Sequence, residues 1–439
     1  MSFFIIMISL FVLILLIAYF KLDTFLSFLI VSIGAGIILG IPFNRLSQTI
    51  ETGIGNLLGN LTLIIVLGAM LGKLVAASGA ATRIAAVMIG WFGTKHIQLG
   101  LLVTGFIVGI PLFYGIGFVL LVPLIFTIVH QYKLPAVCIG LPMLCALSVT
   151  HGFLPPHPSP VALVSMFHAD LGITLIIGLL VAIPVVILAG PVFSKTLKNI
   201  KYAPVKLFEP QKDVCSRQTP GKYNSLITAV LPVFLLIIAT LIPIGFPGMG
   251  TQVSSVFAWM GAPSMVMLIA LIIATYTLGI RQGRTIKEIM TIYADAVRDI
   301  AMILLIIAGS GVFKQVMEES GVSAELAGVL QHLPIHPLVL GWLMAALIRA
   351  CIGSATVAAL TAAGVIVPLV EQTGINPNLM VLSLGAGSIF FSHVNDAGFW
   401  MFKEYFGLSL KDTFRSWSVM ETIVSVAGLI GVLIVNIFI

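Results

Sequence analysis

Long apolar runs separated by short polar breaks make up most of this chain. Three of these runs contain no charged residue: Thr24–Asn44, Thr52–Gly72 and Leu171–Ser194. A fourth uncharged run, Tyr223–Ile280, is divided into two by Pro243–Gly250. Because about 20 apolar residues cross a bilayer as a helix, these runs are long enough to span a membrane. The pattern predicts an all-α polytopic membrane protein.

One polar break occurs twice along the chain. Thr150–His157 follows a short apolar segment, Ser392–Asp396 follows another, and their histidines, His151 and His393, lie 242 residues apart (393 − 151). The same separation relates two further pairs, Ser78-Gly79 with Ser320-Gly321 and Pro135 with Pro377. A separation that recurs at several places predicts two related halves, an arrangement typical of membrane transporters.

This duplication divides the chain into five parts. They are an extra N-terminal span (1–21), a first repeat (22–193), a basic loop (194–224), a linking span (225–261) and a second repeat (262–439). Within each repeat we expect an amphipathic linker followed by a second span: Pro42–Leu58 before Leu61–Val75, and Arg281–Asp299 before Ile300–Phe313. An interrupted apolar run, the short segment with its histidine break, and a last span complete each repeat.

The composition excludes a soluble protein. Hydrophobic residues make up 59% of the chain and charged residues only 9%, whereas soluble proteins carry roughly 25% charged residues. Although the net charge is +6, the basic side chains gather in Lys195–Lys222, as expected for a cytoplasmic loop under the positive-inside rule. We therefore expect the protein to lie in a lipid bilayer and not to bind nucleic acid.

The charges that flank the repeated Ser-Gly pair differ between the two copies. They are basic in the first copy and acidic in the second: Lys73, Arg83 and Lys95 against Glu318, Glu319 and Glu325. Because lysine and arginine favour the cytoplasmic side, we expect the two repeats to be inverted relative to each other. With the basic loop in the cytoplasm, this orientation gives about 14 membrane segments and places both termini outside.

Several segments are too short to cross the membrane or break within it. Pro135–Thr150 would span about 24 Å as a helix, less than the hydrocarbon core of roughly 30 Å. The interrupted runs break near mid-depth, at Pro111–Gly117 and at Cys351–Thr356. Irregular backbone at that depth must be buried in protein or line a cavity. Paired discontinuous or re-entrant helices therefore indicate a substrate site near the midplane.

The break that follows Arg349 is a candidate anion site. Gly353 lets the chain turn, and Ser354 and Thr356 offer hydroxyl groups. The free N–H groups at the start of the next half-helix favour an anion. The alternative for the two hydroxyl residues is helix packing. Because an arginine within a membrane is costly unless it is paired, Arg349 would either bind substrate or form a structural pair with Asp396.

The second histidine break carries His393, Asn395 and Asp396. Ionisable residues within a membrane are functional candidates. We expect Asp396 to take and release a coupling proton and His393 to relay it, because imidazole titrates near neutral pH. Asn395 offers donors and an acceptor to substrate hydroxyl groups. The alternative is that Asp396 only caps a helix.

In the first break, His151 is the stronger site candidate because its counterpart in the second repeat is His393. His157 follows two prolines and is expected to be a structural residue of an extended loop. Two histidines without a third ligand are a weak indication of zinc, and the chain has no G-x-x-x-x-G-K-[ST] loop for ATP. We expect no cofactor besides the coupling ion, and no enzymatic activity.

Five stretches resemble the gluconate permease family of bacterial proton symporters, and the similarity runs nearly from end to end. They are G-A-M-L-G-K (Gly68–Lys73), L-S-V-T-H-G-F-L-P-P-H-P (Leu147–Pro158), G-V-F-K-Q-V (Gly311–Val316), G-S-A-T-V-A-A (Gly353–Ala359) and S-H-V-N-D-A-G-F-W-M-F-K-E-Y-F (Ser392–Phe406). The resemblance implies a multi-pass protein of the bacterial cytoplasmic membrane that imports gluconate or a related sugar-acid monoanion with a proton. It also implies inverted repeats with re-entrant hairpins.

Within such a transporter, each candidate residue has an expected role. Arg349, Ser354 and Thr356 would hold the carboxylate of the substrate, while Asn395 and His151 would meet its hydroxyl groups. The chain departs from the family pattern at Phe113–Gly117, where many relatives carry F-[FY]-E-V-G and this chain lacks the glutamate. If that glutamate moves the proton in relatives, coupling here would rest on another group such as Asp396.

Other functions stay open from the sequence alone. One is a symporter for another small hydroxy or amino acid, such as idonate, fructuronate or D-serine, with either a proton or sodium as the coupling ion. A membrane-embedded metal hydrolase would use His151, His157 and Asp396, and a channel would conduct without saturation. The oligomeric state is also open, with a homo-oligomer as one alternative.

Overall fold

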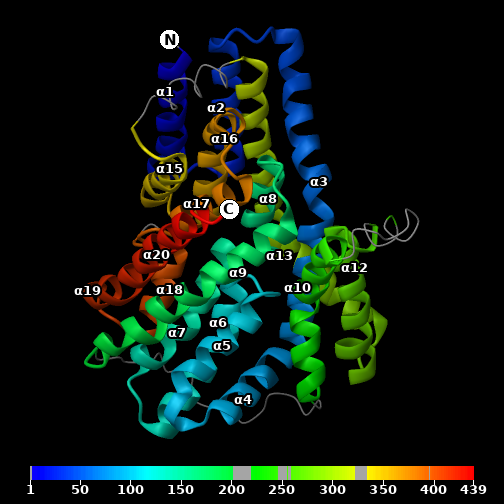
Figure 1. Ribbon diagram of the computed structural model, residues 1–439, viewed down its shortest axis with the longest axis vertical. Helices are drawn as coiled ribbons and strands as arrows, with labels where there is room; N and C mark the ends of the chain where they lie inside the picture. The colour runs from blue at the N-terminus through cyan, green and yellow to red at the C-terminus, as the bar shows by residue number, and fades with distance from the viewer. Residues whose placement is uncertain (1, 201–218, 246–254, 256–258, 322–333, 395) are drawn as a thin grey trace.

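The computed structural model describes residues 2–200, 219–245, 255, 259–321, 334–394 and 396–439, which form helices and no strand (Figure 1). Seven of these helices are long and apolar enough to cross a membrane, or up to eight if the bent helix α3 (Phe43–Ala77) is one span. The predicted set of membrane segments also includes shorter apolar helices, among them α2 (Thr24–Ile38). The all-α membrane fold is confirmed for this part of the chain.

Along the chain, a linking helix separates the helices of the two halves. The first half contains α1 (Ser2–Ile14), α2, α3, α4 (Ala80–Phe92), α5 (Ile97–Gly109), α6 (Tyr114–Tyr132), α7 (Ala136–Phe153), α8 (Pro158–Met166) and α9 (Leu171–Ile187). After α10 (Lys222–Gly245), the second half contains α12 (Pro263–Ala274), α13 (Ile286–Glu319), α15 (Pro337–Ile352), α16 (Ala355–Thr373), α17 (Pro377–Ser388), α18 (Ala397–Phe406), α19 (Leu410–Thr413) and α20 (Val419–Asn436). Most of the predicted basic loop lies outside the described residues.

The order of the helices repeats between the halves. A long helix (α3, α13) precedes two helices joined by a break (α5 and α6; α15 and α16), then a short buried helix (α7, α17) and a last span (α9, α20). The breaks, 110–113 and 353–354, overlap the two predicted mid-depth breaks. In Figure 1 the pair α5 and α6 lies near the lower end and the pair α15 and α16 near the upper end. The inversion of the two repeats stays a prediction.

The two long helices differ from the sequence prediction. In each half the predicted linker and the following span belong to one helix, α3 with 35 residues and α13 with 34, but α3 bends by 45° between Gly59 and Leu61, where the sequence predicts the boundary. A straight helix of the length of α13 extends about 50 Å, more than the thickness of the hydrocarbon core. The reason is that neither linker ends in a proline, and amphipathic and apolar turns share one helical period. The helices touch at two glycines: a Cβ on Gly311 would lie 2.4 Å from the Gly53 oxygen.

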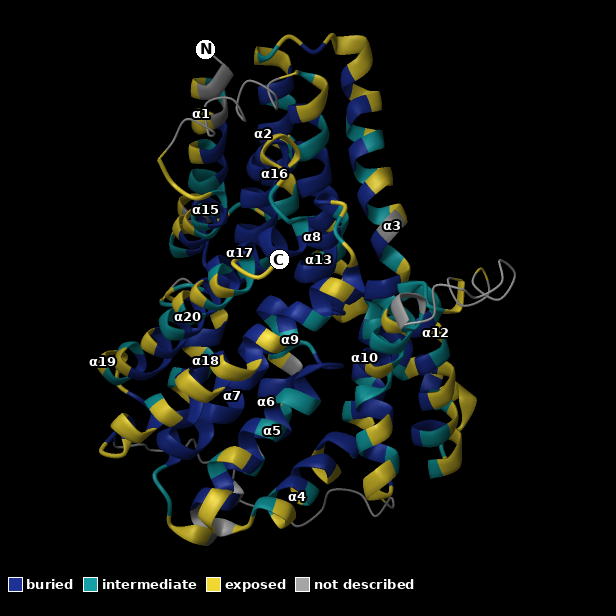
Figure 2. Ribbon diagram, in the orientation of Figure 1, coloured by how far each residue is buried: buried dark blue, intermediate teal, exposed yellow. Residues whose placement is uncertain are grey.

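Helix α7 is the most deeply buried element of the first half (Figure 2). All of its residues except the half-buried His151 are buried, as expected for a helix that is apolar on every side. The predicted end at Thr150 is wrong, because the helix continues to Phe153 and places His151 in its last turn. It stops at Leu154, which adopts an extended conformation (ψ 124°) because Pro155 follows it.

The outer helices present apolar side chains to their surroundings. Leu180 and Ile183 on α9, Phe234 on α10 and Ile430 on α20 are each more than half exposed. Large apolar surfaces are unfavourable in water but are compatible with lipid tails. The buried centre and the apolar exterior therefore agree with a protein that lies in a bilayer and keeps its polar groups inside.

Candidate functional site

The break between α15 and α16 is built around Gly353. This residue has a φ of 84°, in the left-handed region that glycine adopts without steric cost, and its N–H donates to the Arg349 carbonyl oxygen at 3.0 Å. Ser354 then caps α16, because its Oγ accepts a hydrogen bond from the Val357 N–H at 3.4 Å. The break therefore reverses the chain inside the protein and aims the N-terminus of α16 at the interior.

A cavity of about 410 Å³ lies at this break, within the roughly 300–1,000 Å³ typical of small-molecule sites. Six of the residues predicted from the sequence line it, and they come from both halves of the chain: His151, Arg349, Gly353, Ser354, Thr356 and Asp396. The remaining lining residues include Tyr114, Ser148, Trp417 and Glu421. The structure thus brings most of the predicted site together in one place.

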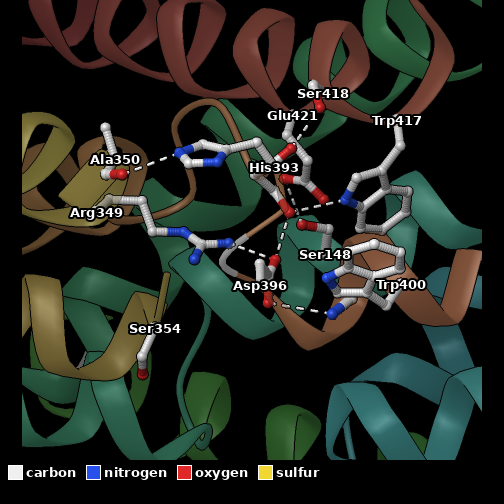
Figure 3. Close-up of polar contacts among 12 residues, drawn as sticks. Ser148, Arg349, Ala350, Ser354, His393, Asp396, Trp400, Trp417, Ser418 and Glu421 are labelled. Atoms are coloured by element: carbon white, nitrogen blue, oxygen red, sulfur yellow. Dashed lines mark hydrogen bonds and ion pairs between the residues drawn. The ribbon is translucent and has the colours of Figure 1, made fainter. Parts of the chain in front are cut away.

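Arg349 is held from one side only. Its side chain is 5% exposed, and its Nη2 donates to the Asp396 carboxylate at 2.6 Å (Figure 3). Its Nε and Nη1 are buried and have no hydrogen-bond partner among the described residues. Because an unpaired buried donor on a charged group is costly, these free donors of the guanidinium group are suited to an anion that enters the cavity.

Asp396 has two structural roles at once. It pairs with Arg349, and it caps α18 because its Oδ1 accepts from the Gly398 N–H at 3.1 Å. The Ser392 hydroxyl also donates to its Oδ2, and Ser392 in turn accepts from the Trp417 indole N–H at 2.8 Å. Both structural alternatives from the sequence, the helix cap and the arginine partner, are therefore present, while its titration stays a prediction.

The histidines of the two breaks differ in their surroundings. His151 lines the cavity, and its Nδ1 is buried without a hydrogen-bond partner among the described residues. His157 is buried behind it, with the ring centroids 5.2 Å apart, and its Nε2 lies 2.7 Å from the Gly109 carbonyl oxygen. That contact is the structural role expected of His157. In the described residues no group of three or more His, Cys, Asp or Glu side chains could hold a metal ion.

His393 does not line the cavity. Its Nε2 lies 2.9 Å from the Ala350 carbonyl oxygen at the end of α15, and Figure 3 shows its ring directed toward Ala350 rather than Asp396. The contact ties the loop before α18 to the α15–α16 break, so the proton relay assigned to His393 from the sequence stays a prediction. Asn395 lies outside the described residues.

Helix N-termini from both halves meet at the cavity. Tyr114 is the first residue of α6, Ala355 and Thr356 begin α16, and Ala397 and Gly398 begin α18, and all of them line the cavity. The first N–H groups of a helix have no partner within that helix, and its dipole is positive at this end. The helix N-termini therefore add partial positive charge to the cavity, which favours an anion.

A family model described as the GntP family permease matches residues 1–438. The chain belongs to the GntP family of permeases. This family membership, with the apolar helices described above, identifies a multi-pass protein of the cytoplasmic membrane.

Curated relatives of this GntP-family permease are similar over almost their whole length. The Gnt-II system L-idonate transporter of Escherichia coli (strain K12) is 47% identical over 418 residues, covering 95% of each chain. A high-affinity gluconate transporter of the same strain is 45% identical, covering 98% of each. The gluconate permease of Bacillus subtilis (strain 168) is 45% identical, covering 95% of each. The resemblance stated from the sequence motifs is thus confirmed.

Two solved structures share the fold of this GntP-family permease at low sequence identity. The Alcanivorax borkumensis YdaH transporter superposes with a TM-score of 0.65 at 16% identity, covering 94% of this chain and 97% of that one. Neisseria gonorrhoeae MtrF superposes with a TM-score of 0.64 at 15% identity, covering 94% and 93%. At such identities the comparison supports the fold alone.

Sequence reasoning missed four polar residues of the permease cavity. They are Tyr114, Ser148, Trp417 and Glu421. Glu421 could have been found, because it is the only charged residue of α20 and ionisable residues within a membrane are functional candidates. Tyr114 directly follows the first break, but nothing in the sequence shows that its hydroxyl group would be buried without a partner beside His151.

Proposed function

We propose that this permease is a secondary active transporter that imports gluconate or a closely related sugar-acid monoanion together with a proton. It moves its substrate without covalent chemistry and is therefore no enzyme. Support comes from the family and from relatives whose names specify gluconate and L-idonate. The cavity between the two halves is the place where such a substrate would bind.

The unpaired donors of Arg349 are the observation that carries the proposal. Its Nε and Nη1 have no partner, and Asp396 takes one of the two N–H groups of Nη2. A substrate carboxylate can therefore accept in parallel from the second N–H of Nη2 and from the neighbouring free donor, and it would bind without breaking the existing ion pair. The N-terminus of α16, with Ser354 and Thr356, would supply further donors to the same anion.

The other unpaired groups fit the polyhydroxy chain of a sugar acid. The Tyr114 hydroxyl and His151 Nδ1 are both buried without a partner among the described residues. A hydroxyl group of the substrate can donate to one and accept from the other, since each hydroxyl is both donor and acceptor. A simple fatty acid would leave these groups unsatisfied, so the cavity favours hydroxylated acids.

Proton coupling has a physical reason. Moving one negative charge into a negative-inside cell costs about 2.3 kcal/mol per 100 mV of membrane potential. A proton that moves with the monoanion removes this cost, because the net charge transferred is then zero. Import against the potential therefore favours a coupled monovalent cation, and the resemblance to proton symporters indicates that this cation is a proton.

Uptake by purified protein in liposomes tests the proposal. Labelled gluconate should accumulate when a pH gradient, acidic outside, is imposed, and a sodium gradient at equal pH should not drive accumulation. Unlabelled L-idonate should compete with it. Uptake should saturate, and internal gluconate should accelerate the entry of label, as expected of a carrier and not of a channel. Failure of the pH gradient to drive uptake of any sugar acid would refute the proposal.

A further inference from the structure

A second carboxyl group stands in the wall of the cavity. Glu421 belongs to α20, is only 2% exposed, and lines the same cavity as Arg349 and Asp396 (Figure 3). Its Oε2 accepts a hydrogen bond from the Ser148 hydroxyl on α7 at 2.8 Å. The function proposed above assigns no role to this residue. A buried acid that faces a substrate cavity within a membrane requires an explanation.

The two acids of the cavity differ in how their negative charge is compensated. Asp396 accepts from the guanidinium group of Arg349, the Ser392 hydroxyl and the Gly398 N–H. Glu421 has no ion pair among the described residues, and its hydrogen-bond partner is the uncharged Ser148. An ionised carboxylate without a cation is costly to bury. The negative charge of Asp396 is therefore compensated by Arg349, whereas Glu421 would be less costly to bury in its neutral, protonated form.

The helices packed around Glu421 do not change this difference between the two acids. The packed helices α9 and α17 and the turn η3 (Leu188–Val192) contain no ionisable residue within their bounds. The turn η8 (Phe414–Ser418) contributes only Arg415, which is exposed. The ionisable groups that face the cavity or the buried acid are Cys145 and His151 on α7, Tyr114 on α6, Arg349 on α15, and Asp396 before α18. Arg349 is the only cation among them that is permanently charged.

We propose that Glu421 carries the proton that is imported with the substrate; this inference rests on the proton-coupled transport proposed above. When the cavity faces the outside, a proton from water binds a carboxylate oxygen of Glu421 and makes it neutral. The substrate carboxylate then binds Arg349 without a second uncompensated negative charge beside it. After the cavity opens to the cytoplasm, the substrate leaves and the proton passes from Glu421 to water. One proton and one monoanion thus cross together.

Glu421→Gln separates proton coupling from substrate binding. Its side-chain carbonyl can still accept from Ser148, and the amide mimics the protonated acid in both charge and shape. Exchange of labelled external gluconate for unlabelled internal gluconate needs only the loaded carrier, so it should persist. Accumulation driven by a pH gradient should fall at least tenfold, and substrate-induced acidification of the liposome interior should be lost. The matched control is Glu404→Gln on α18, an acid that is 63% exposed and should behave as wild type.

The outcomes distinguish this inference from the proposed function. If the wild-type protein transports no sugar acid, the proposed function fails. If the wild type accumulates gluconate and Glu421→Gln does so equally well, the inference is overturned. A folded Glu421→Gln variant that exchanges no substrate would also overturn it.

Should Glu421→Gln fail to fold, Ser148→Ala provides a second test. The Ser148 hydroxyl stabilises the ionised acid. Its removal should therefore raise, by roughly 0.5–1 unit, the pH at which the KM for gluconate reaches twice its low-pH value. An unchanged pH profile would overturn the inference.

Discussion

Arg349→Lys tests the proposed carboxylate site without removing the buried positive charge. Arginine keeps Nε and Nη1 free while Nη2 binds Asp396. A lysine ammonium can keep the pair with Asp396 but cannot also present two parallel donors to a substrate carboxylate. The variant should therefore fold, because Asp396 is not left without a cation, yet it should bind the substrate more weakly.

The size of the effect follows from the contacts that are lost. A hydrogen bond to a charged group contributes about 1.5–3 kcal/mol. The ammonium can restore one of the two substrate contacts at most, so the variant loses about one such bond. At 5% exposure of Arg349, solvent screening reduces this loss little. The KM for gluconate should therefore rise roughly 10- to 150-fold.

Initial rates of labelled gluconate uptake, measured over a wide range of concentration in proteoliposomes, provide the assay. Thermal unfolding in detergent shows whether the variant is folded. Arg298→Lys is the matched control, because Arg298 forms an exposed ion pair with Asp295 on the long helix α13 and should leave KM unchanged. A folded Arg349→Lys protein with the wild-type KM would refute the carboxylate assignment.

Three further variants test other parts of the structure. His151→Gln should raise KM about fivefold by removing one neutral hydrogen bond worth about 1 kcal/mol; an unchanged KM in the uptake assay would exclude His151 as a substrate ligand. Gly311→Ala should lower the unfolding temperature, because its Cβ would lie 2.4 Å from the Gly53 oxygen, whereas the exposed Gly55→Ala on α3 has no atom within 4 Å and should be neutral or stabilising. Gly353→Ala places a side chain at φ 84°, at a cost of about 1–3 kcal/mol, and should reduce transport more than expression; wild-type uptake would show that the break does not need glycine.

Much of the fold could be predicted because a membrane-spanning helix requires a long apolar run and does not depend on the exact order of its residues. The breaks before α6 and before α16 were visible in the sequence, since polar or glycine-containing stretches interrupt long apolar runs. The boundary predicted after Leu58 falls at the 45° bend of α3, whereas the continuous helix α13 was missed, because an amphipathic stretch carries no stop signal when it leads into a span. The end of α7 was misplaced by three residues, since the histidine looked like part of a loop.

The candidate site could be predicted only where the residue itself is unusual in a membrane. Arg349 and Asp396 are charged residues next to apolar segments, and their pairing could be anticipated as one of two alternatives. His393 matched His151 in sequence but contacts a backbone carbonyl instead of the cavity, and only the packing of α15 against its loop decides that. The burial of the Tyr114 hydroxyl likewise depends on contacts between distant segments.

A structure of the protein with gluconate bound tests the central claim most directly, namely that the interrupted helices of both halves enclose one substrate site. The substrate carboxylate should lie about 2.7–2.9 Å from an unpaired donor of Arg349, Nε or Nη1, with its hydroxyl groups beside Tyr114 and His151. Gluconate bound elsewhere, with Nε and Nη1 of Arg349 still unpaired, would contradict the account.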